Sequence, residues 1–259
     1  YIGDKWGGKY LRSPDIFLEI TRKNAMLKFG DKIDGRQFVK VIGYVHDNNT
    51  GKNFPKVNFI KTIKDTRKIC LNKDDTVKFG VNPKGNSLLI APILFPRTYG
   101  RDHIVLYNKD KCVAKEFYRI IPQFDPIELV LYMNSTFFIL QRELIGLVNL
   151  GGGALKFSGD DIKRFLYPKN LLDFDMRKVT KQFMDREIKP FFLEVGLDPE
   201  SEVPLSEQEP QPLPDRKALD DVVFDALNLT ADERKEVYRA VCQLVWNRIG
   251  KAKSVKKRK

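Results

Sequence analysis

The chain has 259 residues, which is enough to bury a substantial core in one or two domains. Its formal net charge is +12, and residues 1–170 carry the whole excess, with 29 Lys and Arg against 17 Asp and Glu. A hydrophobic fraction of 42% is typical of a globular protein. No apolar run reaches the roughly 18 residues that a membrane-spanning helix needs.

The N-terminal part of the sequence predicts one short helix, followed by a region rich in strands. The segment from Trp6 to Glu19 ends in this helix, with Ser13 as its cap and Pro14 at an early helical position. Polar and apolar residues then alternate, or form short apolar runs between turn residues, as strands do. The strands are expected at residues 37–46, 57–63, 76–81, 88–95 and 103–107.

The strongest helix prediction covers residues 125–147. Asp125 suits the N-cap, and Pro126 suits the first helical position, where its missing N–H costs nothing. The segment is apolar on most faces, which is typical of a buried helix on which strands pack. Asn134 lies inside this helix, and we expect its side chain to form a structural hydrogen bond to a neighbouring strand rather than to contact a ligand.

A glycine triplet, Gly151–Gly153, ends this helix and turns the chain. A short strand is expected at residues 154–157. A helix at 160–166 follows, with Ser158 as its cap and two aspartates in its first turn. We interpret the triplet as a tight turn rather than a dinucleotide-binding loop, because it lacks the spaced glycines and the acidic residue about 20 residues further on.

The last third of the chain differs in character from the rest. Residues 171–197 predict an amphipathic helical connector, and residues 198–214 form an acidic, proline-rich linker. Residues 215–259 predict a helical extension, in which Thr230 and Glu233 form a capping box. The extension ends in a basic run, which is either an arm that faces DNA or a solubilising tail.

Motifs for phosphate loops, zinc proteases and serine hydrolases are absent from the sequence. The cysteines lie far apart, so they form neither a CxxC motif nor a clear disulfide framework, and we expect a reducing cytoplasm. His46 and His103 are the only histidines, which argues against a structural zinc site. We therefore expect no metal. The three cysteines are Cys70, Cys112 and Cys242.

The excess of positive charge indicates a surface for a polyanion, most often nucleic acid. Several cations accompany the predicted strands and turns, where they are suited to phosphate contacts that set affinity without reading sequence. The alternative for each is a solvated strand edge. The candidates are Lys52, Lys56, Lys61, Lys64, Arg67 and, beside the short strand after the glycines, Lys156.

The segment at residues 96–103 predicts contacts with bases. Arg97 and Arg101 can each bind O6 and N7 of a guanine through two hydrogen bonds. Tyr99 is suited to stacking on a base or packing against a sugar. The alternative is an ordinary hairpin in which Arg97 pairs with Asp102.

The order of elements over residues 117–168 resembles the target-recognition domain of bacterial N6-adenine DNA methyltransferases. It also resembles that of the related fused type II restriction-modification enzymes, with their TaqI-like C-terminal specificity domain. A strand leads into a long apolar helix that carries Asn134 and Ser135, and a glycine triplet, a short strand and a Ser-capped helix follow. The resemblance implies an α+β fold, in which a mixed, twisted β-sheet packs on a long buried helix and a C-terminal helical extension follows.

As the resemblance implies, residues 1–170 form a recognition domain for double-stranded DNA. Such a domain positions an adenine for a catalytic domain, in cis or in trans, that uses S-adenosylmethionine. The Phe-x-Gly-x-Gly and Asn-Pro-Pro-Tyr motifs of that catalytic domain are absent from this sequence. We therefore expect this chain to be a fragment without activity or cofactor. Its parent would be an adenine-specific methyltransferase of the bacterial or archaeal cytoplasm, associated with the nucleoid, and some relatives also cut DNA.

Two other functions remain open from the sequence. A specificity subunit of a multi-subunit restriction system is one, although such subunits usually carry two recognition domains and one is evident here. A non-catalytic protein-interaction module with incidental positive charge is the other, and it predicts weak binding to DNA that does not depend on Arg97 and Arg101.

Overall fold

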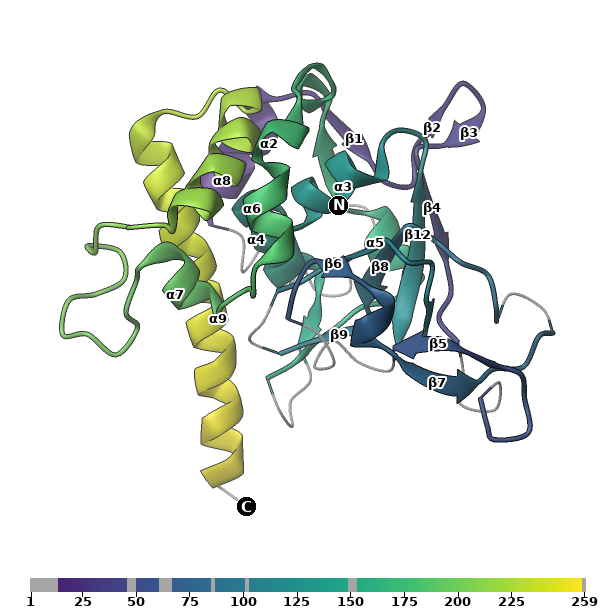
Figure 1. The fold of residues 1–259 in the computed structure, drawn as a ribbon. Coiled ribbons are helices and arrows are strands. Elements are labelled where there is room, and N and C mark those ends of the chain that lie inside the picture. The colour runs from purple at the N-terminus through teal and green to yellow at the C-terminus, as the bar shows by residue number, and fades with distance from the viewer. Residues whose placement is uncertain are drawn as a thin grey trace.

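The computed structural model of the chain describes residues 14–45, 50–60, 67–84, 87–100, 103–148 and 153–257. They form the expected α+β fold, in which most helices gather on one side and the β-sheets on the other (Figure 1). Within these ranges, no helix is long and apolar enough to cross a membrane. The helices are α2 (Asp15–Lys23), α3 (Pro126–Met133), α4 (Thr136–Ile145), α5 (Gly159–Lys163), α6 (Thr180–Asp185), α7 (Phe191–Val195), α8 (Pro214–Ala226) and α9 (Ala231–Lys257), with 3-10 turns η4 (Lys73–Asp75), η5 (Lys169–Asp173) and η6 (Met176–Val179).

The central sheet has five strands in the order β4-β12-β8-β10-β6. Its strands pair antiparallel except β6, which runs parallel to β10, so the sheet is mixed. Strand β8 is buried along its whole length and β12 over its first four residues, and Ile93, Phe95 and Ile120 are each 0% exposed. The strands are β4 (Val39–Ile42), β12 (Phe117–Pro122), β8 (Ile93–Pro96), β10 (Leu106–Asn108) and β6 (Cys70–Leu71).

Smaller sheets surround this one. Two have three strands, in the orders β11-β5-β7 and β13-β14-β9, and two are antiparallel pairs, β1-β15 and β2-β3. Their strands are β11 (Val113–Ala114), β5 (Lys56–Ile60), β7 (Val77–Gly80), β13 (Leu147–Val148), β14 (Leu155–Lys156), β9 (Thr98–Tyr99), β1 (Met26–Lys28), β15 (Leu166–Pro168), β2 (Lys32–Ile33) and β3 (Arg36–Gln37).

The helix expected at residues 125–147 is in fact two helices, α3 and α4. Its beginning was predicted correctly, because Asp125 caps α3 by accepting a hydrogen bond from the amide of Ile127 at 2.8 Å, with Pro126 in the first turn. The prediction of one continuous helix is wrong at Ser135, which has an extended backbone and caps α4 through its hydroxyl group. A cap residue starts a new helix, so the axis breaks there.

Asn134, at the break, forms the structural hydrogen bonds expected of it. Its amide accepts from the backbone N–H of Val105 and donates to the carbonyl of Val105, both at 2.9 Å, and it also donates to Val130 at 2.7 Å. The side chain is 1% exposed. Its side chain therefore connects the segment before β10 to the end of α3 by the same pair of backbone hydrogen bonds that a neighbouring strand would form.

Replacing Asn134 with alanine is expected to lower the free energy of unfolding by roughly 1–3 kcal/mol, because buried polar groups of Val105 lose their partner. Urea unfolding followed by circular dichroism measures this. Asn170→Ala is the matched control, since that side chain is exposed. Equal stability of the two variants would contradict the account.

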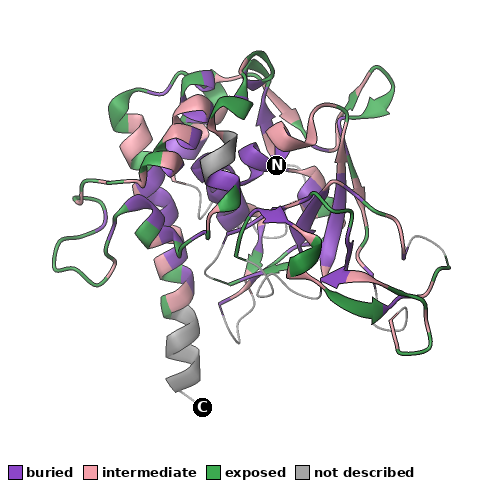
Figure 2. Cartoon of the chain, viewed as in Figure 1, coloured by how far each residue is buried: buried purple, intermediate pink, exposed green. Residues whose placement is uncertain are grey.

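One continuous hydrophobic core joins the β-rich part to the C-terminal helices. Leu219 and Val223 of α8 and Val241 of α9 belong to the same buried cluster as Phe137 and Leu140 of α4. Helix α9 packs along α4 and also against α2, and its buried face is visible in Figure 2. Two predicted caps are confirmed: Ser158 with Asp161 begins α5 and Thr230 with Glu233 begins α9.

Candidate nucleic-acid interface

The antiparallel pair β5-β7 has one apolar face and one basic face. In its register, Val57 lies opposite Phe79 and Phe59 opposite Val77, so these four side chains share a face. Val57 and Phe59 pack in a small hydrophobic cluster, whereas Val77 and Phe79 are exposed; the ring centres of Phe59 and Phe79 lie 5.2 Å apart. The other face carries Lys78 beside Asn58, and Lys56 is diagonal to Lys78.

Both of these lysines are exposed, and so is Lys52 in the preceding turn. The turn is held closely to β7, because the amide of Gly51 donates to the carbonyl of Gly80 at 3.0 Å. A Cβ at Gly80 would lie 2.0 Å from the carbonyl oxygen of Gly51, so only glycine allows this approach. The pair and its turn lie at the outer edge of the β-rich side, where β7 is largely exposed (Figures 1 and 2). We call Lys52, Lys56, Asn58 and Lys78 the basic ribbon.

Lys78 and Asn58 were not among the residues predicted from the sequence. Both lie within segments whose alternation predicted strands, but only the pairing register shows that they share a face with Lys56. The register could not be predicted from the sequence, because residues 61–76, which include β6 and η4, separate the two strands.

Arg67 lies apart from the basic ribbon. Its guanidinium group donates to Glu187 at 2.8 Å, and both side chains are largely exposed. The carbonyl of Arg67 also accepts from the amide of Ile188 at 2.8 Å, which places it against the helical side. An exposed pair of this kind contributes little stability, but it balances the charge of Arg67 locally. The predicted Lys61 and Lys64 lie outside the described residues.

The small sheet β13-β14-β9 presents a second exposed face. Its register aligns Leu147 with Lys156, and Lys156 with Thr98, so these side chains form one row across three strands. Leu147 is 70% exposed, and the other two are exposed as well. We call Leu147, Lys156 and Thr98 the outer row. On the inner face, Leu155 lies opposite Tyr99, and both are 0% exposed.

The prediction that Tyr99 contacts a base or a sugar is not met by its position. Its ring packs edge-on against Phe95 and Phe157, with the guanidinium group of Arg142 at 4.5 Å from its centre. Successive strand residues point to opposite faces, so Thr98 points outward and Tyr99 inward. Burial raises the pKa of Tyr99, as expected for a phenol in the core.

Arg97 is half-buried at the edge of this sheet. Its guanidinium group donates to Glu116 at 3.2 Å and lies 4.4 Å from the centre of the Tyr44 ring. The alternative partner considered from the sequence, Asp102, lies outside the described residues, as does Arg101. Arg97 is thus positioned by Glu116 and Tyr44, with part of its surface open to solvent.

A buried cluster of charges lies behind the outer row. Arg248 of α9 donates from Nε and Nη2 to the two carboxylate oxygens of Glu143, at 2.9 and 2.8 Å. His103 Nε2 lies 3.0 Å from the same carboxylate. Although burial alone would raise the pKa of Glu143, His103 and Arg248 lower it to about 2. Nothing in the sequence pattern indicated that Arg248 and Glu143 would meet.

The stability of the chain is expected to fall between pH 6.5 and pH 4 through His103. Burial lowers the pKa of His103 from 6.5 to about 4; Glu143 opposes this shift, whereas Arg142 and Arg248 add to it. Between these two pH values the unfolded chain binds a proton at His103 and the folded chain does not. The free energy of unfolding is therefore highest above pH 6.5 and falls as the pH decreases toward 4.

The measurement is urea unfolding at pH 7 and at pH 4.5 for the wild type and for His103→Gln. The variant cannot titrate at this position, so its stability should change less over this range. An equal pH dependence in both proteins would contradict the assignment.

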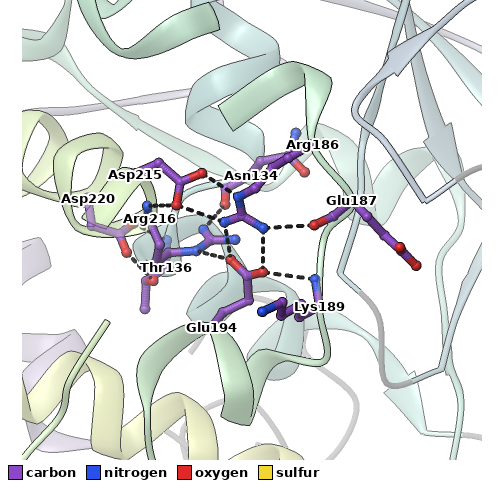
Figure 3. Close-up of polar contacts among 9 residues, drawn as sticks. All are labelled: Asn134, Thr136, Arg186, Glu187, Lys189, Glu194, Asp215, Arg216 and Asp220. Atoms are coloured by element: carbon purple, nitrogen blue, oxygen red, sulfur yellow. Dashed lines mark hydrogen bonds and ion pairs between the residues drawn. The ribbon is translucent and has the colours of Figure 1, made fainter. Parts of the chain in front are cut away.

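A second buried cluster, shown in Figure 3, joins α7, α8 and the α3–α4 junction. Glu194, at 0% exposure, accepts two hydrogen bonds of 2.8 Å from Arg186 and one of 3.2 Å from Arg216. Arg216 also donates to the carbonyl of Asn134. Asp220 accepts from the amide and the hydroxyl group of Thr136, at 2.7 and 2.6 Å. Arginines pair with Glu194, and Thr136 donates to Asp220, so we interpret the cluster as structural.

Within the described ranges, no group of three or more His, Cys, Asp or Glu side chains could hold a metal ion. Asp161 accepts hydrogen bonds from the amide and hydroxyl groups of Ser158 at 2.8 and 2.7 Å. The three cysteines are buried and unpaired.

No protein-family model and no curated protein sequence matches this chain. Among solved structures, its fold is similar to part of the type IIG restriction endonuclease BpuSI, with a TM-score of 0.62 and 10% sequence identity. The matched region covers 95% of this chain and 34% of that chain, so this chain spans about a third of that enzyme's length. At this identity the comparison shows a shared fold, one found in a restriction-modification enzyme.

Proposed function

We propose that this chain is the DNA-recognition part of a restriction-modification enzyme. The observation that carries the proposal is that two small sheets each expose a face that carries cations, and that the sheet β13-β14-β9 is anchored by a buried inner face. Cations held on paired strands are positioned more rigidly than cations on a loop, as recognition of a duplex requires. The similarity to part of BpuSI supports the same conclusion.

The basic ribbon is the part best suited to bind the backbone and groove of DNA. A two-stranded antiparallel ribbon fits the major groove of B-DNA. Lys52, Lys56 and Lys78 are exposed along it and are assigned to phosphates. Asn58 lies directly opposite Lys78, and an asparagine amide can bind N6 and N7 of adenine.

The outer row is assigned to a second part of the same duplex. Lys156 is exposed at its centre and is suited to a phosphate or to a guanine edge, with the hydroxyl group of Thr98 beside it. Leu147 is suited to contact the methyl group of a thymine. Arg97 lies at the edge of this sheet, where Glu116 orients it.

The finer form of the proposal is a specificity domain of an N6-adenine DNA methyltransferase of the TaqI-like kind. It is supported by the order of elements from β12 to α5, in which two helices, α3 and α4, take the place of the one long helix that was expected. In this proposal, S-adenosylmethionine and the methyl transfer belong to a catalytic domain outside this chain, in cis or in trans. The chain itself supplies DNA binding and positions the duplex.

The test is the affinity of the chain for a random-sequence duplex over a series of salt concentrations. Each phosphate contact releases counterions, so three or four contacts predict a log–log slope of about −3 to −4. A slope near zero, or no binding at low salt, would contradict the proposal. It would favour the alternative, a protein-interaction module with incidental charge.

A further inference from the structure

We propose that Arg248 of the C-terminal helix is a positioning residue for base recognition, which rests on the proposed function of the outer row. Its guanidinium group holds the ends of two strands in the sheet β13-β14-β9 at fixed places relative to each other and to α9. The C-terminal extension is thereby part of the DNA-reading unit, although its own residues at this point contact no DNA.

The geometry of Arg248 assigns this role. Besides its two bonds to Glu143, it donates from Nη2 to the carbonyl of Gly100 at 3.1 Å and from Nη1 to the carbonyl of Gly153. Gly100 directly follows β9, and Gly153 lies two residues before β14. One planar group therefore contacts the segments that adjoin the two neighbouring strands, which carry Thr98 and Lys156.

The cluster fixes the guanidinium group in one orientation. Arg248 is 5% exposed, and both oxygens of Glu143 accept from it, so it cannot rotate without breaking the pair. His103 Nε2 lies 3.0 Å from Oε1 of the same carboxylate, and His103 comes two residues before Val105, whose amide Asn134 binds. A lysine ammonium is a point charge and cannot direct donors to four acceptors in this plane.

The chemistry of recognition explains why this placement matters. Hydrogen bonds to base edges need donors and acceptors placed within about 0.5 Å. Attraction to phosphates tolerates larger shifts, because it is largely electrostatic and independent of sequence. Loosening the sheet β13-β14-β9 should therefore reduce selectivity and leave the affinity of the basic ribbon for any duplex unchanged.

The test compares Arg248→Lys and Arg248→Met with the wild type, using two probes: the duplex that the wild type enriches from a random pool, and an unselected random duplex. We expect the ratio of the two affinities to fall roughly 5- to 100-fold, which corresponds to the loss of about one base contact. The affinity for the random duplex and its salt slope should stay within about twofold of wild type.

Arg239→Lys and Arg239→Met are the matched controls. Arg239 lies on the same helix, and its partners are in the proline-rich segment: it donates to the carbonyl of Gln208 at 2.8 Å and lies 3.7 Å from Glu209. A purely structural role for Arg248 predicts that both affinities fall together, in proportion to the loss of folded protein. That outcome, or an unchanged ratio, would overturn the proposal.

Amide hydrogen exchange separates this proposal from the proposed function. If Arg248 positions the two strands, amides in residues 98–100 and 153–157 exchange faster in Arg248→Lys than in Arg239→Lys, in the absence of DNA. If these amides exchange faster in Arg248→Lys but the wild type selects no DNA sequence, the proposed function is contradicted and the positioning role of Arg248 in the sheet is not. Unchanged exchange in these segments would overturn the role of Arg248 whatever the protein binds.

Discussion

Replacing Glu194 with alanine is expected to lower the free energy of unfolding by about 3–5 kcal/mol, because a buried ion pair loses one partner. The remaining arginines, Arg186 and Arg216, would lose three hydrogen bonds from Glu194. Arg216 is 1% exposed and would keep only its bond to the carbonyl of Asn134 among the contacts that Figure 3 draws for its guanidinium group. Water cannot replace the lost carboxylate without opening the core.

Urea unfolding at pH 7 measures this loss, with Glu202→Ala as the control. Glu202 is an exposed carboxylate in the proline-rich segment, where a substitution changes stability by about 0.5 kcal/mol or less. Glu194→Gln separates charge from shape, since it keeps the volume and one acceptor. A loss below about 1 kcal/mol in Glu194→Ala would show that the cluster does not carry the stability assigned to it.

Replacing Lys52, Lys56 and Lys78 together by glutamine is expected to remove most of the electrostatic affinity for DNA. Each lost phosphate contact should reduce the steepness of the log affinity against log salt plot by about 0.9. The slope of the triple variant should therefore be less negative than that of the wild type by about 3. The weakening should be uniform across sequences, because phosphates carry no base information. Fluorescence anisotropy with a random duplex, repeated over a salt series, measures both quantities.

The control for this triple variant has the same net charge. Lys169, Lys178 and Lys217 are exposed lysines of the helical part, and their replacement by glutamine removes three charges away from the basic ribbon. If binding follows the contacts of the ribbon, the control should keep nearly the wild-type slope. Equal losses in the two triple variants would mean that net charge alone drives binding.

Local capping signals were the most predictable part of this fold. Asp125, Ser158 and Thr230 each begin a helix as expected, because a cap depends only on residues within one turn. Ser135 is a cap of the same kind, yet it sat in an apolar run that predicted a continuous helix. Because the surrounding residues are apolar on most faces of a helix, the pattern favoured one continuous helix over a break at Ser135.

Contacts between residues far apart in the sequence could not be predicted from residue patterns. Lys78 joins the basic ribbon through the strand register, and Tyr99 shares the buried face of its sheet with Leu155. The pairing of Arg248 with Glu143 spans 105 residues and leaves no periodic trace in the sequence. Long-range pairing of this kind depends on the packed fold, which residue patterns do not encode position by position.

The C-terminal helices were expected to form an extension of the recognition domain, but they pack into its core. Their apolar faces complete the same core as α4, so α8 and α9 stabilise the β-rich part directly. Truncating the chain before α8 would expose the buried faces of α4 as well as Arg142 and Glu143. DNA-binding tests therefore need the chain with both helices.

Selection of bound duplexes from a random pool, followed by sequencing, tests the central claim most directly. If the chain is a DNA-recognition domain, the wild type enriches a defined sequence, and a variant with Lys156→Gln and Thr98→Ala enriches it less or not at all. Binding that persists without any enriched sequence would contradict the claim, because the chain would then hold DNA only through its charge.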